Sequence, residues 1–175
     1  PSEPQSGKSA SISLENTLRL NLIESVPAEE GLGSLRVYSF TGTPVDCVKM
    51  GVNLFINEDR MPDLLVSGIN HGSNASVASI YSGTLGAAAE GAVYDIPSIG
   101  LSMNTHKAEP DFEGVLHYSR IIMDKLLKTG ISKGIYLNVN FPNIPLQEIK
   151  GLKIGHQGHG RWVREFEKRT DPRGR

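Results

Sequence analysis

Several features are scarce in this sequence, and each scarcity narrows the class of protein. The 175 residues contain one cysteine, Cys47, which excludes an internal disulfide and is typical of a reducing compartment. Lys and Arg number 18 against 19 Asp and Glu, so the net charge of −1 favours no nucleic acid, membrane or acidic partner. No apolar run is long enough to span a bilayer. We therefore expect a cytoplasmic protein with no membrane contact, in which any phosphate recognition is local.

Several common catalytic motifs are also missing. The sequence has no GxGxxG fingerprint of a dinucleotide-binding enzyme, no HExxH and no CxxC. No closely spaced pair of carboxylates follows a predicted strand, although a hydrolase that uses a hard cation is expected to have one. His156 and His159 lie three residues apart, but no acidic or cysteine partner completes a metal site, so we interpret them as loop residues.

The apolar pattern predicts strands that alternate with helices. Such alternation is typical of parallel βαβ units, and 38% hydrophobic residues suit one domain with a real core. The expected strands cover residues 9–13, 18–22, 35–40, 64–69, 97–102 and 136–141. One expected helix begins at Pro44, and two more cover residues 85–93 and 112–129.

The run from Val66 to Thr84 carries the main functional signal. An apolar strand ends near Asn70 and leads into a loop rich in Asn, Ser and Gly. Ser82 or Thr84 can then cap a helix, whose first N–H groups are unpaired and whose dipole favours an anion. The alternative is a loop in which these side chains satisfy only local backbone groups.

Polar residues also follow the other predicted strands. Ligands of open α/β sheets bind outside the carboxyl ends of the strands, so we expect these groups to converge on one rim. Asn and Thr are also ordinary cap and turn residues, and Thr43 is expected to be a cap. The residues are Thr41, Thr43, Asn70, Asn104, Asn140 and Asn143.

The tail from Arg161 to Arg175 is basic and contains Trp162 and Phe166. A tryptophan with flanking arginines can bind a nucleotide or nucleic acid by stacking. A solvated arm that pairs with another subunit is the commoner meaning of this pattern, and we favour it.

Several blocks in the same order resemble the survival protein E (SurE) family of nucleotidases. The resemblance runs over nearly the whole chain, and it implies a Rossmann-like three-layer α/β sandwich with a mostly parallel sheet and a β-hairpin or arm toward the C-terminus. The matching blocks are PSEPQSGKSASIS at 1–13, TGTPVDCV at 41–48, VSGIN to YSGT at 66–84, EPDFEG at 109–114, YLNVNFP at 136–142 and GRW at 160–162.

The resemblance implies a metal-dependent phosphatase that hydrolyses nucleoside 5′- and 3′-monophosphates, with short polyphosphate as a further substrate of some members. Family members hold Mg²⁺ or Mn²⁺ with an Asp-Asp pair, a Ser and an Asn, and the last two match Ser6 and Asn70. The phosphate pocket of the family matches Ser82, Gly83 and Thr84, with Asn74 in the loop beside it. Catalytic roles are implied for Asn70, Ser82 and Thr84.

One departure from the family pattern concerns the metal. The Asn-Asp-Asp-Gly segment that ends the first strand of the family has no match here, and two neutral oxygens bind a hard dication poorly. We expect residues 1–175 to form one SurE-like domain that lacks its first strand and its C-terminal end. The resemblance implies a homodimer or homotetramer without a stable nucleic-acid complex. The alternative is a noncatalytic nucleotide- or phosphate-binding module with an incomplete metal site.

Overall fold

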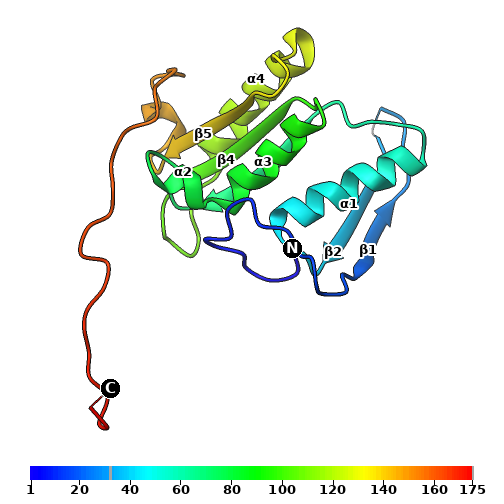
Figure 1. Ribbon diagram of the computed structural model, residues 1–175. Helices are drawn as coiled ribbons and strands as arrows, with labels where there is room; N and C mark the ends of the chain where they lie inside the picture. The colour runs from blue at the N-terminus through cyan, green and yellow to red at the C-terminus, as the bar shows by residue number, and fades with distance from the viewer. Residues whose placement is uncertain (32, 175) are drawn as a thin grey trace.

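The computed structural model of the chain describes residues 1–31 and 33–174 (Figure 1). Strands and helices alternate over most of this length, as the apolar pattern predicts. The elements are β1 (Leu20–Val26), β2 (Leu35–Phe40), α1 (Pro44–Asn57), β3 (Leu65–His71), α2 (Ala78–Tyr81), α3 (Gly83–Val93), β4 (Ser98–Asn104), α4 (Glu113–Thr129), β5 (Tyr136–Pro142) and a 3₁₀ turn, η1 (Leu146–Glu148).

The main sheet has the order β3-β4-β5, and both strand pairs are parallel. The central strand β4 is buried from Ser98 to Met103, which agrees with the rule that parallel strands are covered on both faces. Its residue Ile99 is fully buried and lies between Val66 of β3 and Leu137 of β5. The predicted parallel sheet is therefore confirmed.

Helices cover both faces of this sheet, which confirms the expected three layers (Figure 1). Gly100 of β4 faces α3, where a Cβ atom would lie 2.6 Å from Leu85 Cδ2. Because side chains alternate along a strand, the neighbouring residues of β4 face the other way. There they pack with Val115 and Leu126 of α4 in a cluster of buried apolar residues: Ile99, Leu101, Met103, Val115, Leu126 and Phe141.

Helix α1 begins as the sequence predicts. The Thr43 hydroxyl accepts a hydrogen bond from the Asp46 N–H at 3.2 Å, the Asp46 carboxylate accepts one from the Thr43 N–H, and Pro44 occupies the first turn. Val45 and Val52 are buried on one side of the helix, as the helical spacing of apolar residues indicates. The expectation that Thr43 is a structural cap is thus confirmed.

Strand β2 does not join the parallel sheet. It pairs antiparallel with β1, with Leu20 opposite Phe40, and the two strands form a separate hairpin beneath α1 (Figure 1). The expectation of a parallel βαβ unit at this point is therefore wrong. The two strands pair antiparallel because the chain reverses direction between β1 and β2.

The strand expected at residues 9–13 is also wrong, because its backbone groups bind loops and caps. The Ser9 N–H donates to the Tyr81 carbonyl at 3.1 Å, and the Ser13 N–H donates to the Asp46 carboxylate at 3.1 Å. Residues 1–13 therefore form an N-terminal loop that lies against α1 and α3.

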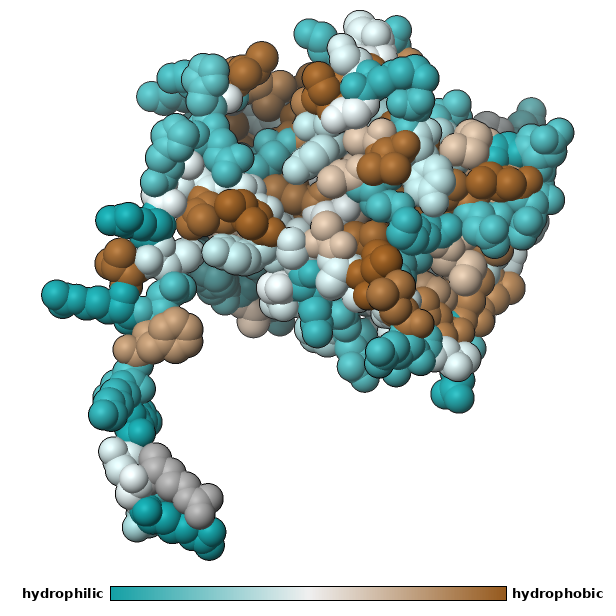
Figure 2. All heavy atoms as spheres, viewed as in Figure 1, coloured by the Kyte–Doolittle hydropathy of each residue, from teal (hydrophilic) through white to brown (hydrophobic). Residues whose placement is uncertain are grey.

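The β-hairpin expected toward the C-terminus is not formed within residues 150–174, which contain no helix or strand. These residues form an extended tail that leaves the domain (Figure 1). Figure 2 shows apolar side chains among the hydrophilic ones of this tail, in which Val163 is 68% and Phe166 94% exposed. The small antiparallel hairpin of the fold is instead β1-β2.

One edge of β3 has no partner strand in the described chain. An apolar cavity of about 420 Å³ runs along this edge, between β3 and the side chains of Val48, Val52 and Phe55 of α1. Among the described helices, none has the length and apolar character needed to cross a membrane.

Candidate functional site

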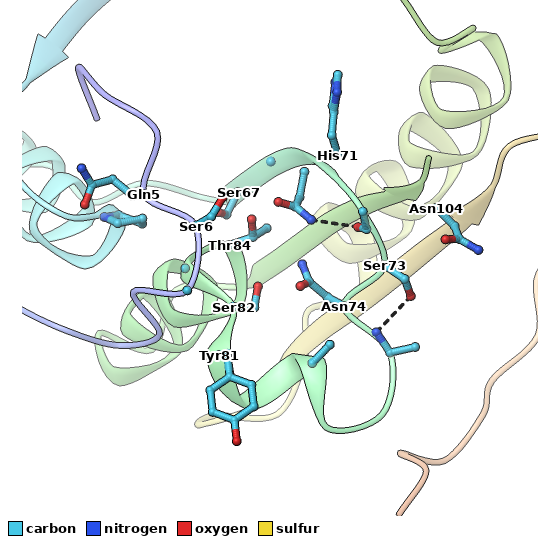
Figure 3. A pocket seen from close by; sticks show the side chains of 18 of the residues that line it. Gln5, Ser6, Ser67, His71, Ser73, Asn74, Tyr81, Ser82, Thr84 and Asn104 are labelled. Carbon is cyan, nitrogen blue, oxygen red and sulfur yellow. Dashed lines mark hydrogen bonds between the residues drawn. The ribbon is translucent and has the colours of Figure 1, made fainter. Parts of the chain in front are cut away.

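A cavity of about 1250 Å³ opens at the carboxyl ends of β3 and β4, beside the start of α3 (Figure 3). It is lined by residues from the N-terminal loop, from the loop after β3 and from α3. Segments that are far apart in the sequence thus contribute to one pocket. All six site residues that the family resemblance implies line it: Ser6, Asn70, Asn74, Ser82, Gly83 and Thr84.

The first turn of α3 forms one wall of the pocket. Ser82 is the N-cap, and its hydroxyl accepts a hydrogen bond from the Leu85 N–H at 3.1 Å. Its O–H hydrogen is left to donate to a ligand. The N–H groups of Gly83 and Thr84 have no intrahelical acceptor, because they belong to the first turn. This wall can therefore bind an anion with two N–H groups and two hydroxyls.

The N-terminal loop that carries Ser6 lies directly against this helix. Ser9 donates through its hydroxyl to the Ile80 carbonyl at 2.6 Å. The Ser9 carbonyl packs so tightly on Gly86 that a Cβ atom on that glycine would collide with it. A Cβ atom on Gly83 would lie 3.3 Å from the Gln5 carbonyl oxygen. Close backbone packing thus holds Ser6 beside the helix start (Figure 3).

A buried carboxylate fastens the other end of this loop. Asp46 is 5% exposed and accepts hydrogen bonds from the Ser13 N–H at 3.1 Å and the Thr43 N–H at 2.9 Å. The Thr43 hydroxyl donates to the Ser11 carbonyl at 2.7 Å. Burial raises the pKa of Asp46, but hydrogen bonds from Ser13 and Thr43 lower it, and the result is a pKa below the ordinary value. The carboxylate therefore stays ionised and holds the loop to α1.

Asn70 lies near the end of β3, and its side chain has a defined orientation. The Nδ2 atom donates to the Gly72 carbonyl at 2.8 Å. No described residue donates a hydrogen bond to its Oδ1 atom, which leaves that oxygen as an acceptor for a cation, a water molecule or a ligand.

Asn74 is held by three hydrogen bonds and is 6% exposed. Its Nδ2 donates to the Ser102 hydroxyl at 2.7 Å, and its backbone N–H donates to Asn140 Oδ1 at 2.8 Å. Its carbonyl accepts from Asn138 Nδ2 at 2.9 Å. These contacts tie the loop after β3 to β4 and β5, so Asn74 shapes the pocket wall as well as lining it.

The expected rim of polar strand ends forms only in part. Asn104 lines the pocket, whereas Asn140 supports it through Asn74. Thr41, Thr43 and Asn143 are not among the lining residues, so the prediction that all strand ends converge is wrong. Thr41 accepts a hydrogen bond from the Arg19 N–H instead, because β2 belongs to the separate hairpin.

Sequence reasoning missed some lining residues. His71 ends β3, and His106 lies two residues after β4. The strand-end rule that selected Asn104 would have found both if it had been applied to every polar residue near a strand end. Trp162 and Arg161 of the tail also line the pocket, which agrees with the stacking role that the sequence offered as an alternative to a subunit-contact arm.

The described residues do not by themselves fit a divalent metal. Ser6 and Asn70 offer two neutral oxygens, and Glu3 is the one carboxylate among the lining residues. Within residues 1–31 and 33–174, no group of three or more His, Cys, Asp or Glu side chains could hold a metal ion. Mg²⁺ and Mn²⁺ prefer carboxylate ligands, so the described residues do not complete a site for either ion.

Comparison with known proteins bears out the resemblance. The family model described as "Survival protein SurE" matches residues 1–164. The chain belongs to the SurE family. It is 44% identical over 175 residues to the 5′-nucleotidase SurE of Cytophaga hutchinsonii and 43% identical over 175 residues to that of Christiangramia forsetii. Each match covers 100% of this chain and 65% of the relative, so this SurE chain spans about two thirds of their length.

A solved SurE structure shows the same fold. The crystal structure of the SurE protein from Aquifex aeolicus matches this SurE chain with a TM-score of 0.75 and 35% identity. The match covers 97% of this chain and 64% of the Aquifex chain. The three-layer fold around the pocket is therefore shared with an experimentally determined family member.

Proposed function

We propose that this SurE chain contains the phosphate-binding half of a nucleotidase that hydrolyses nucleoside 5′- and 3′-monophosphates. One observation carries the proposal: the six residues that match the family's metal and phosphate segments line a single pocket at the strand ends. Short polyphosphate is the further substrate that the family resemblance implies for some members. The relatives are named 5′-nucleotidase SurE, which supports the 5′-monophosphates of this substrate class.

The pocket residues have different roles in binding and catalysis in this proposal. The first turn of α3 binds the phosphate oxygens through the N–H groups of Gly83 and Thr84. The Ser82 and Thr84 hydroxyls donate to oxygens on which charge builds in the transition state. Asn70 presents Oδ1 to the attacking water or to the group that activates it, because its Nδ2 is already bound to Gly72. Asn74 keeps the opposite wall in place.

A divalent cation, Mg²⁺ or Mn²⁺, would supply charge neutralisation and an activated water to such a site. Ser6 and Asn70 would contribute two neutral oxygen ligands in this proposal, and Glu3 is the one carboxylate among the described lining residues.

Two variants and a matched control test the proposal. Asn70→Ala is expected to lower kcat for 5′-AMP on the order of 10²-fold, since it removes a placed polar group from the reacting centre. Ser6→Ala is expected to raise the metal concentration needed for half-maximal rate. Asn143→Ala removes an asparagine that does not line the pocket and should leave phosphate release unchanged. Undiminished turnover in Asn70→Ala would remove the proposal.

A noncatalytic nucleotide- or phosphate-binding module is the second candidate, and the neutral donor set of the described residues favours it. It predicts saturable 5′-AMP binding that chelator does not change and that produces no phosphate. Isothermal titration with and without EDTA, beside a phosphate assay, separates the two candidates.

The remaining parts of the proposal concern the setting of the enzyme. We place the protein in the cytoplasm because a chain with a single cysteine is typical of a reducing compartment. We also expect a homodimer or homotetramer in which the tail contacts another subunit. No nucleic-acid complex is expected. Sedimentation of the purified protein tests the assembly.

A further inference from the structure

The tail crosses the wall of the pocket before it leaves the domain. The Gly160 N–H donates to the Ser76 hydroxyl at 3.1 Å. A Cβ atom at Gly158 or Gly160 would lie 3.3 or 2.9 Å from Ser76 Oγ, so side chains at these positions would crowd the crossing. Two glycines thus bring the next two residues, Arg161 and Trp162, to the pocket that Ser82 and Thr84 also line.

Trp162 has the properties of a stacking platform. Its side chain is 65% exposed, and no hydrogen bond or ring contact holds it in the described chain. The indole therefore makes a small contribution to the core and keeps a face available for a planar ligand. Tyr81 is the other large aromatic side chain that lines the pocket, and it is 54% exposed.

The positive charge that lines the pocket also comes from this segment. Arg161 is the one Lys or Arg side chain among the described lining residues, and none of the described carboxylates pairs with it. The protein as a whole carries a net charge of −1, so Arg161 supplies the local positive charge that a phosphate monoester requires. A cavity of about 1250 Å³ is also larger than a phosphate group needs.

We propose that the segment Gly160–Trp162 recognises the nucleoside monophosphate beyond its phosphate group, with Trp162 stacking on the base and Arg161 contacting the phosphate. This inference rests on the proposed function, because it assumes that the phosphate binds at the start of α3. It assigns base recognition to the tail, which otherwise resembles a subunit-contact arm.

The test uses 5′-AMP and ribose 5-phosphate, which carry the same phosphate and sugar but differ in the base. Trp162 is the only tryptophan of the chain, so its fluorescence reports directly on the segment. Saturable quenching by 5′-AMP is expected, with no change on ribose 5-phosphate binding. Titrations are run in EDTA and in Mn²⁺, beside calorimetry of both ligands.

Three variants separate the contributions. Trp162→Ala should weaken 5′-AMP binding by about tenfold and leave ribose 5-phosphate binding within about twofold, while Trp162→Phe should restore most of the loss. Arg161→Ala should weaken both ligands alike. Phe166→Ala is the matched control, because Phe166 is an exposed aromatic residue of the same tail that does not line the pocket.

The outcomes distinguish this inference from the proposed function. If 5′-AMP binds and is hydrolysed while Trp162→Ala matches the unchanged protein and the fluorescence is constant, the base-stacking inference is overturned and the nucleotidase stands. If Trp162 quenching and the variant effects occur without phosphate release, the inference stands and the nucleotidase falls. Binding of neither phosphate ester overturns both.

Discussion

At the residue scale, Asn74 shows how a polar side chain can be both a pocket residue and an anchor. Its three hydrogen bonds connect the loop after β3 with Ser102, Asn138 and Asn140. The family resemblance implied that Asn74 belongs to the phosphate pocket, but the strands that it joins become apparent only when the sheet is assembled. Because these contacts are buried, we expect that removing the Asn74 side chain lowers the stability of the fold as well as ligand binding.

Asn74→Ala is expected to lower the free energy of unfolding by about 1–3 kcal/mol, because it leaves the buried Ser102 hydroxyl without its donor. Urea unfolding measures this change. Asn143→Ala should unfold at the same urea concentration as the unchanged protein, and an equal loss in both variants would contradict the anchoring role.

At the scale of elements, the start of α1 couples helix capping to the position of the N-terminal loop. Asp46 completes the capping box with Thr43 and also accepts the Ser13 N–H. The sequence predicts the cap, since Thr43 and Pro44 are adjacent. The contact with Ser13 joins residues 33 positions apart and is not visible in local sequence.

Asp46 also makes a pH-dependent contribution to stability. Its folded pKa is below the ordinary value of 3.8, so the unfolded chain binds the proton first as the pH falls. The stabilisation is therefore complete above pH 3.8 and is lost as the pH falls through the lowered folded pKa. Asp46→Asn should cost about 1 kcal/mol at neutral pH. Thermal unfolding should show that this deficit narrows below pH 3.8, and a deficit that widens there would contradict the account.

Two glycines, one in a crowded helix position and one in an open helix position, test the packing of the N-terminal loop on α3. In Gly86→Ala the new Cβ atom would collide with the Ser9 carbonyl and lie 3.1 Å from Ala10 Cα, so we expect about 1–3 kcal/mol of destabilisation and weaker 5′-AMP binding. Gly51→Ala in α1 meets nothing within 4 Å and should stabilise by about 0.5–1 kcal/mol. Calorimetric unfolding compares them, and a stabilised Gly86→Ala would refute the close contact.

At the scale of the whole molecule, local patterns predicted most elements, whereas pairing between distant segments had to be observed. The strand ending near Asn70 and the helix capped by Ser82 follow from neighbouring residues, and both were found. The alternation at residues 9–13 also fits a strand, but its backbone binds Tyr81 and Asp46 instead. The neighbouring residues in the sequence do not indicate those distant partners.

The same limit applies to the candidate site. Strand ends indicated Asn70 and Asn104 because the parallel sheet brings them to one edge, but the pairing of β2 with β1 moved Thr41 away from it. The tail residue Trp162 reaches the pocket through a crossing at Ser76 that is 84 positions away from Gly160. Contacts over such separations depend on the completed fold.

The central claim is that this pocket serves a metal-dependent nucleotidase. The most direct measurement is inorganic phosphate released from 5′-AMP by the purified protein, with Mn²⁺, with Mg²⁺ and with EDTA. We expect release that requires the metal and is abolished by EDTA. Release that is indifferent to EDTA, or 5′-AMP binding without release in either metal, would contradict this expectation.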